Sequence, residues 1–184
     1  MILPENAESY ALVGECLTQP IRRAGVYKED IMINQESVKN EIIRKLDRMN
    51  LVNIDISSGM HVSTHHVGLS DEELLRRQKQ DRQGFVSSFV DENTVNVCLY
   101  EMFSDEYFLE KELIPFLSAA AEKMEFEYDS FDCDTVGRVV LPNGGILEVN
   151  SFRIVLSKSL AGGGERDINT GMPFSVITMF PVKN

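Results

Sequence analysis

Three histidines within six residues form the first group of side chains that could carry chemistry: His61, His65 and His66. Because histidine titrates near neutral pH, a solvent-reachable cluster of this kind suits proton transfer or metal binding. A helix would place His61 and His65, four residues apart, on one face, which is the geometry of a two-histidine metal pair. No further ligand stands at a recognisable spacing, so proton transfer is favoured over a metal site. The alternative is that these histidines only cap and pack a short helix.

Two other segments carry groups suited to a phosphate. Arg77 follows His66 by eleven residues in a basic stretch, and its guanidinium offers two parallel donors to one phosphate. Near the C-terminus, a strand would place Thr178 and Phe180 on the same face, where a hydroxyl could bind a phosphate and a ring could stack on a base. Each segment also has a purely structural interpretation. Arg77 could lie on a solvated amphipathic helix, and Thr178 and Phe180 could be an ordinary strand residue and a core residue.

The histidines and Arg77 require two consecutive helices. Residues 60–67 predict a short helix that ends at Gly68. Ser70 and Glu73 form a capping box that begins a second helix running to about Asp81. Further along, Asp91 caps a predicted helix, and another follows from Asp105 with Pro115 as a kink or break.

The pattern changes to strands after residue 123. Met124, Phe126 and Tyr128 alternate with acidic residues, which is typical of a half-buried strand. Further predicted strands cover residues 84–89, 137–141, 146–149, 152–156 and 174–180. Helices followed by strands with short connections indicate an α+β fold whose sheet is mainly antiparallel.

Residues 1–56 form a separate, mainly helical segment in this interpretation. Apolar residues at helical spacing predict a helix over residues 37–50, and a shorter one over residues 8–17. The small and polar residues 54–60 look like a joint between domains. We therefore expect one domain over residues 57–184, preceded by a helical junction or delivery segment.

Composition narrows the class of protein. The chain has 184 residues, of which 43% are hydrophobic and 26% charged, the balance of a globular protein. No apolar run is long enough to span a membrane, and the N-terminus has no secretory signal. The three cysteines, Cys16, Cys98 and Cys133, are few and widely spaced, so they do not predict a disulfide framework and favour a reducing compartment.

The net charge of −11 at first argues against a nucleic-acid partner. However, residues 91–135 carry thirteen acidic and two basic residues, so the whole excess lies in this segment and the rest is nearly neutral. The acidic segment is either a solvated helix face or a docking surface for a basic partner protein.

Taken together, these segments resemble a known family. HVSTHHVGLSDEELLRR resembles the H-x-x-x-x-H-V-G-x-S/T-D-x-E-L-x-x-R opening of the bacterial ribonuclease A-like toxin domain of contact-dependent growth inhibition (CdiA-type) and related polymorphic toxins. The similarity continues in order through SSFVDENTV, EFEYDSFDCDTVGRVV, FRIVLSKS and VITMFPV, about residues 58–183. It implies a ribonuclease A-like fold without disulfides. It also implies metal-independent RNA cleavage, and a cognate immunity protein that inhibits the toxin.

The resemblance also implies a set of site residues. His66 matches the family's active-site histidine, Arg77 its arginine and Thr178 its terminal threonine, while Phe180 replaces a tyrosine and so lacks its hydroxyl. We expect the 2′-hydroxyl of RNA to attack the phosphate, with His66 as base or acid, Arg77 and Thr178 on the phosphate, and no cofactor. The products would be a 2′,3′-cyclic phosphate and a free 5′-hydroxyl.

Supporting roles fall to the neighbouring residues. His61 is the candidate second proton-transfer group, and His65 and Phe180 are candidates for binding the substrate. The domain would be exported as the C-terminal part of a larger effector and act in the cytoplasm of a target cell. The alternative function is a non-catalytic module on the same fold that binds RNA or protein.

Overall fold

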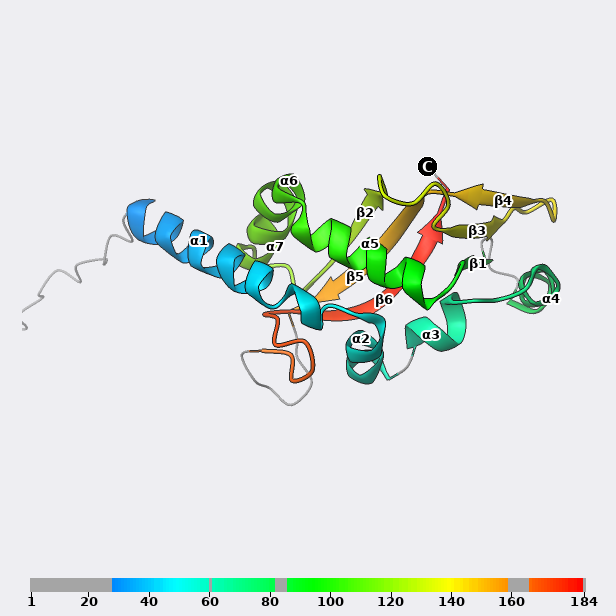
Figure 1. Ribbon diagram of the computed structural model, residues 1–184, viewed down its shortest axis with the longest axis horizontal. Coiled ribbons are helices and arrows are strands. Elements are labelled where there is room, and N and C mark those ends of the chain that lie inside the picture. Colours follow the sequence, from blue (N-terminus) through cyan, green and yellow to red (C-terminus); the bar gives the residue numbers. More distant parts are fainter. Residues whose placement is uncertain (1–27, 60, 82–85, 159–165, 184) are drawn as a thin grey trace, which may run out of the picture.

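The structure of the chain is a computed structural model that describes residues 28–59, 61–81, 86–158 and 166–183 (Figure 1). Helices occupy the first part and antiparallel strands the second, which confirms the predicted α+β class. The expected helix over residues 8–17 and the N-terminal cysteine lie outside the described residues. None of the helices in the described part combines the length and hydrophobicity that a membrane span requires.

The first helices pack into the main core. Helix α1 (Lys28–Arg44) is followed by a 3₁₀ turn, η1 (Leu46–Arg48), and then by α2 (Leu51–Ser58). The predicted apolar face is confirmed, since Ile42, Leu46 and Met49 are buried. The helix itself begins earlier than predicted and ends at Arg44.

The prediction of a polar joint over residues 54–60 is wrong, because residues 54–58 belong to α2. Asn50 begins this helix by accepting a hydrogen bond from the Asn53 amide at 3.1 Å, and Ile54 is buried against the rest of the fold. Gly59, at φ +73°, ends the helix in a left-handed conformation. The core therefore continues across residues 56 and 57, and the assignment of residues 1–56 to a delivery segment stays a prediction.

The two helices that carry the candidate site form as expected. Helix α3 (His61–His66) is followed by Gly68 at φ +67° and by α4 (Asp71–Asp81). The Ser70 hydroxyl accepts a hydrogen bond from the Glu73 amide at 3.2 Å, which confirms the serine cap of α4. Strand β1 (Val86–Phe89) comes next.

The following helical region has an unexpected widened turn. Asp91 caps α5 (Glu92–Ser104), as predicted. Then α6 (Glu106–Phe108), a π-helical segment η2 (Leu109–Leu113) and α7 (Ile114–Ser118) follow one another without interruption. Proline has no amide hydrogen and its ring clashes with the carbonyl one turn back. The wider π turn before Pro115 accommodates this clash, so the helix does not break there.

The strands form two antiparallel sheets. In one, β3 (Gly137–Val140) lies between β1 and β4 (Ile146–Val149). In the other, β5 (Ser151–Ser157) lies between β2 (Lys123–Asp129) and β6 (Ser175–Val182). The predicted alternation in β2 holds for Phe126, which is buried, and Tyr128, which is half-buried, while Glu125 and Glu127 are exposed. It is wrong for Met124, which is exposed at the start of the strand.

Aromatic side chains join the helices to the sheets. Helix α5 lies over the β2–β5–β6 sheet in Figure 1, and the rings of Phe103 and Phe174 stack at 5.3 Å between their centroids. The two sheets meet at Gly137, where a Cβ atom would collide with the Ser88 carbonyl and the Pro181 ring. Helices α2 and α3 pack against β6, which brings the histidines to the last strand of the chain.

Candidate active site

The three histidine rings lie together at the contact between α3 and β6. The ring centroids of His61 and His66 are 5.6 Å apart, and those of His61 and His65 are 4.8 Å apart. The ring of Phe180, on β6, lies 5.5 Å from that of His66. A hydrogen bond joins α3 to α2, since the buried carboxylate of Asp55 on α2 accepts from the Ser63 amide of α3 at 3.1 Å.

His66 differs from the other two histidines in its environment. Its ring is half-buried, whereas His61 and His65 are exposed. Burial lowers the pKa of His66 to about 4, and the positive charges of the neighbouring histidines and of Arg77 act in the same direction. A hydrogen bond with the backbone of Ser87 partly opposes this effect. His66 is therefore a neutral imidazole at neutral pH and is able to accept a proton.

Arg77 lies beside the histidines and holds their helix. Its guanidinium donates to the carbonyl oxygens of His65 at 3.0 Å and Thr64 at 3.3 Å, and its Nε donates to Glu73 at 3.2 Å. These bonds cap the carboxyl end of α3 with a positive charge. They use three of the five N–H groups of an arginine.

Strand β1 supports the same corner between α3 and α4. The amide of Leu69 donates to the Ser88 hydroxyl at 3.0 Å, and Arg138 donates to the Leu69 carbonyl at 2.7 Å. Val67 also forms an isolated bridge with Phe89. The end of α3, which carries His66, is therefore fixed from both sides.

Two buried polar atoms at this site have no hydrogen-bond partner among the described residues: His66 Nδ1 and Thr178 Oγ1. Thr178 shares its face of β6 with Phe180, as the sequence predicted, and both are half-buried. Because an unpaired buried polar atom is unfavourable, such atoms in a folded protein call for an explanation, and a ligand is one. In this chain they fall on two of the predicted site residues.

A hollow of about 240 Å³ adjoins this cluster. Ser87 and Phe180, which both interact with His66, form part of its lining. Arg153 and Lys183 line it as well, and Arg153 also forms ion pairs with Glu125 and Glu127.

The structure thus brings together most of the predicted site residues: the three histidines, Phe180 and Arg77, with Thr178 on the same strand face. Sequence reasoning missed Glu73, which orients Arg77, and Ser87, which contacts His66. The spacing of Glu73 and Arg77, four residues apart on a helix, was the available signal for that ion pair. No local signal marked Ser87. No group of three or more possible metal ligands occurs among the described residues, so His61 and His65 lack a third ligand there.

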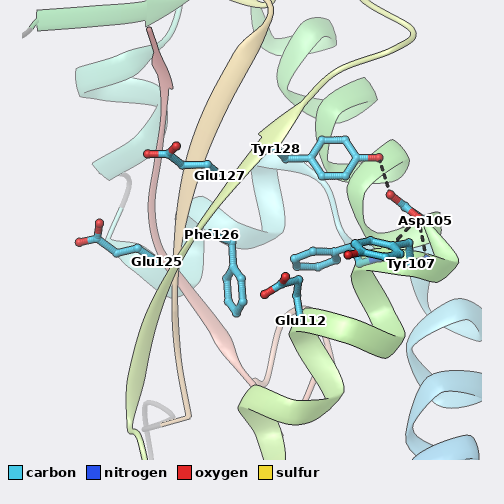
Figure 2. Close-up of a pocket in the computed structure, with 8 residues that line it drawn as sticks. Asp105, Tyr107, Glu112, Glu125, Phe126, Glu127 and Tyr128 are labelled. Carbon is cyan, nitrogen blue, oxygen red and sulfur yellow. Dashed lines mark hydrogen bonds between the residues drawn. The ribbon is translucent and has the colours of Figure 1, made fainter. Parts of the chain in front are cut away.

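A second hollow lies between the α6–η2 helices and β2 (Figure 2). Its lining is unlike that of the histidine site and consists of four acidic and four aromatic residues: Asp105, Tyr107, Phe108, Glu112, Glu125, Phe126, Glu127 and Tyr128. Figure 2 shows the Tyr128 hydroxyl reaching Asp105, at 3.1 Å. The acidic excess of residues 91–135 therefore lies partly on a strand, not on helices alone.

Comparison with known proteins first identifies the fold. A solved structure described as the crystal structure of a CdiA-CT/CdiI complex from Y. kristensenii 33638 matches with a TM-score of 0.51 and 24% sequence identity. The match covers 67% of this chain and 99% of that one. No curated protein sequence matches the chain.

The family follows from the sequence itself. Residues 60–181 match the model of the bacterial CdiA-CT RNAse A domain, and the chain belongs to this family. The resemblance predicted over residues 58–183 is thereby confirmed. Membership identifies the chain as a ribonuclease-type toxin domain of contact-dependent growth inhibition.

Proposed function

We propose that this chain cleaves RNA by transphosphorylation, with the 2′-hydroxyl of the substrate as nucleophile. The attack would give a 2′,3′-cyclic phosphate and release the 5′-hydroxyl of the next nucleotide. The protein must then supply a base, a group that stabilises the negative charge on the phosphate, and an acid for the leaving oxygen. Residues of each type lie at the contact between α3 and β6.

The observation that carries the proposal is the pair of unpaired buried atoms, His66 Nδ1 and Thr178 Oγ1. They belong to the elements α3 and β6, which pack against each other. In the proposed complex the substrate supplies their missing partners. Both atoms are covered from solvent, so RNA must displace neighbouring side chains, and the exposed ring of His61 lies 5.6 Å from that of His66.

His66 acts as the base in this proposal. With a pKa of about 4 it is unprotonated at neutral pH, so it accepts a proton from the 2′-hydroxyl without first losing one. The sequence left open which role it has, and the lowered pKa favours the base. His61, exposed and next to His66, is assigned the role of the acid that protonates the leaving 5′-oxygen.

The remaining residues bind the substrate. Arg77 directs its guanidinium to the non-bridging oxygens, and Thr178 donates to the phosphate. Phe180 stacks on a base, a role that does not need the hydroxyl of the family's tyrosine. His65, exposed beside His61, contacts the RNA backbone.

We further propose that the domain is the C-terminal part of a larger exported effector and acts in the cytoplasm of a target cell. The family match supports delivery from a larger protein. The complex described for the Y. kristensenii protein supports a cognate immunity protein as partner for this chain too. Such a partner protects the producing cell from its own toxin.

Incubation of the purified chain with total RNA and with tRNA, in the presence of EDTA, tests the proposal. We expect fragments that end in a 2′,3′-cyclic phosphate. His66→Ala should reduce the rate about 10²–10⁴-fold, the contribution of a general base. His65→Ala removes a neighbouring imidazole that is assigned only a contact with the RNA backbone, so it should weaken substrate binding but lower the rate at saturating RNA far less than His66→Ala does.

Two outcomes contradict the proposal. Cleavage that stops in EDTA and returns with zinc or magnesium would replace the base mechanism with metal catalysis. Binding of RNA without cleavage, unchanged in His66→Ala, would identify the chain as the non-catalytic module that the sequence left as an alternative.

A further inference from the structure

Two of the three cysteines, far apart in the sequence, lie together in the fold. Cys98 is on α5 and is fully buried in the core. Cys133 lies in the connection between β2 and β3, half-buried, and packs against the same core. Both are free thiols in the structure. The proposed cleavage mechanism uses neither of them.

A carboxylate on α5 fastens the connection that carries Cys133. Glu101, almost fully buried, accepts hydrogen bonds from the Ser130 hydroxyl at 2.7 Å and from the Phe131 amide. The Ser130 hydroxyl in turn accepts a hydrogen bond from the Cys133 amide at 3.1 Å. Cys98 precedes Glu101 by three residues, so both side chains project from one face of α5. The clamp therefore holds Cys133 over the helix face that carries Cys98.

The two thiols differ in their environments. Burial is the largest cause that raises the pKa of the Cys98 thiol, and the nearby Cys133 acts in the same direction. Because a thiolate is the attacking species in disulfide exchange, the buried Cys98 is a poor first nucleophile. Cys133, which solvent partly reaches, is the thiol that an external disulfide meets first.

We propose that Cys98 and Cys133 form a reversible disulfide when the domain is exposed to an oxidising thiol–disulfide couple. In the first step the Cys133 thiolate attacks a small disulfide such as oxidised glutathione, forming a mixed disulfide and releasing one glutathione. Cys98 then loses its proton and attacks the Cys133 sulfur, which releases the second glutathione. The protein loses two protons and two electrons, and one oxidised glutathione takes them up to become two reduced ones.

The bond would be made and broken along the proposed route of delivery, and this part of the inference rests on the proposed function. Export exposes the chain to oxidising compartments, where disulfides persist, and the cytoplasm of a target cell is reducing. A crosslink between α5 and the β2–β3 connection constrains the unfolded chain and so stabilises the fold during passage. Reduction on arrival restores the two free thiols.

Mass spectrometry of the full chain carrying Cys16→Ser tests the pairing. After incubation with oxidised glutathione and digestion without reductant, we expect one linked species that joins the peptides of Cys98 and Cys133. A reductant should separate it. The melting temperature should be higher in the oxidised protein by roughly 5–10 °C. Cys98→Ala and Cys133→Ser are matched controls, and each should abolish both the link and the temperature difference.

Either of two results would overturn the proposal: both cysteines reacting with an alkylating reagent once the oxidised protein has been denatured without reductant, or a glutathione adduct on Cys133 that never resolves. The linked species is read by mass on the Cys16→Ser protein, so the test does not depend on how either control variant folds. It also does not depend on RNA cleavage. Failure of the disulfide therefore leaves the ribonuclease proposal untouched, and the reverse also holds.

Discussion

Burial of the His66 ring keeps it neutral at neutral pH but makes the folded protein less stable in acid. In the folded protein its half-buried ring has a pKa of about 4, so it stays neutral until the pH approaches that value. In the unfolded chain it has an ordinary pKa of 6.5. Between pH 6.5 and pH 4 the unfolded state therefore binds a proton at this residue, whereas the folded state does not. Above pH 6.5 the ring is mainly neutral in both states, and the protein loses stability as the pH falls from 6.5 toward 4.

We expect the free energy of unfolding to fall by about 3 kcal/mol between pH 6.5 and 4 because of this residue alone. Denaturant unfolding at a series of pH values measures it. His66→Gln, which cannot titrate, should show a flatter profile in this window. Equal slopes in the two proteins would mean that the pKa of His66 is the same in the folded and unfolded states, which would remove the argument from its lowered pKa.

Arg77 and Arg76 are neighbours with different surroundings, which makes them a matched pair. Arg77 binds the carboxyl end of α3, whereas Arg76 is more exposed and interacts with Glu73 and Gln80 within α4. Lysine cannot reproduce a planar donor group that contacts two carbonyls and a phosphate at once.

Arg77→Lys should therefore lose most of the RNA-cleaving activity, with a loss of folding stability of at most about 2 kcal/mol. Arg76→Lys should change both quantities little. Cleavage assays and thermal melts of the two variants measure this. Similar losses at the two positions would show that α4 does not present Arg77 to the substrate.

At the scale of elements, the segment before β6 ties that strand to α2 through one carboxylate. Asp167 is buried and accepts hydrogen bonds from Ser57 on α2 at 2.9 Å, from Ser175 on β6 at 2.7 Å and from the Thr170 amide at 3.0 Å. Burial by itself raises the pKa of Asp167, but these hydrogen bonds outweigh it and the net pKa is lowered. The arrangement positions β6, and with it Thr178 and Phe180.

Asp167→Ala should destabilise the protein by roughly 2–4 kcal/mol, because several buried donors lose their acceptor. Denaturant unfolding measures the loss, and Asp132→Ala, at an exposed acidic residue, is the control. RNA cleavage at a temperature where the variant remains folded should also fall, since β6 carries site residues. A variant as stable as the original chain would mean that α2 and β6 hold together without this carboxylate.

At the scale of the whole molecule, charge is divided between regions. The hollow of Figure 2 is lined by carboxylates and aromatic rings, whereas Arg77 lies beside the histidines and Lys183 lines the neighbouring hollow. Arg153 connects the two hollows, since it lines the second one and forms ion pairs with Glu125 and Glu127 of the first. The acidic residues of the α6–η2 helices still present a surface that complements a basic protein, and such complementarity mainly accelerates association.

We expect Glu112→Lys with Glu122→Lys to slow association with the immunity protein at low salt, while RNA cleavage stays the same or rises slightly. Stopped-flow or surface-binding kinetics at several salt concentrations measure this. Glu110 is a poor choice for the substitution, because its ion pair with Lys39 of α1 would be lost as well. An unchanged association rate would mean that the acidic segment serves solubility and not docking. A loss of cleavage would mean that these acidic residues belong to the active site.

The sequence by itself determined the elements whose signals are local. The serine cap before α4, the aspartate cap before α5 and the glycine after α3 are each recognised from a few adjacent residues, and all three hold in the structure. The alternation in β2 and the apolar face of the first helix also follow from periodicity alone. Residues 54–58 were misread because their own composition is that of a connection, and only burial of Ile54 against the core makes them a helix.

Only the tertiary structure decided how the distant parts of the site meet. Periodicity placed His66, Arg77 and Thr178 on separate elements, but the pKa of His66 depends on burial by groups from β1 and β6, and Arg77 binds carbonyls of another helix. The closeness of Cys98 and Cys133 likewise depends on a carboxylate clamp that no spacing predicts. Local hydrogen bonds and side-chain periodicity are determined by residues close together in the sequence. Burial, and the pKa values and contacts that follow from it, exist only once the whole chain has packed.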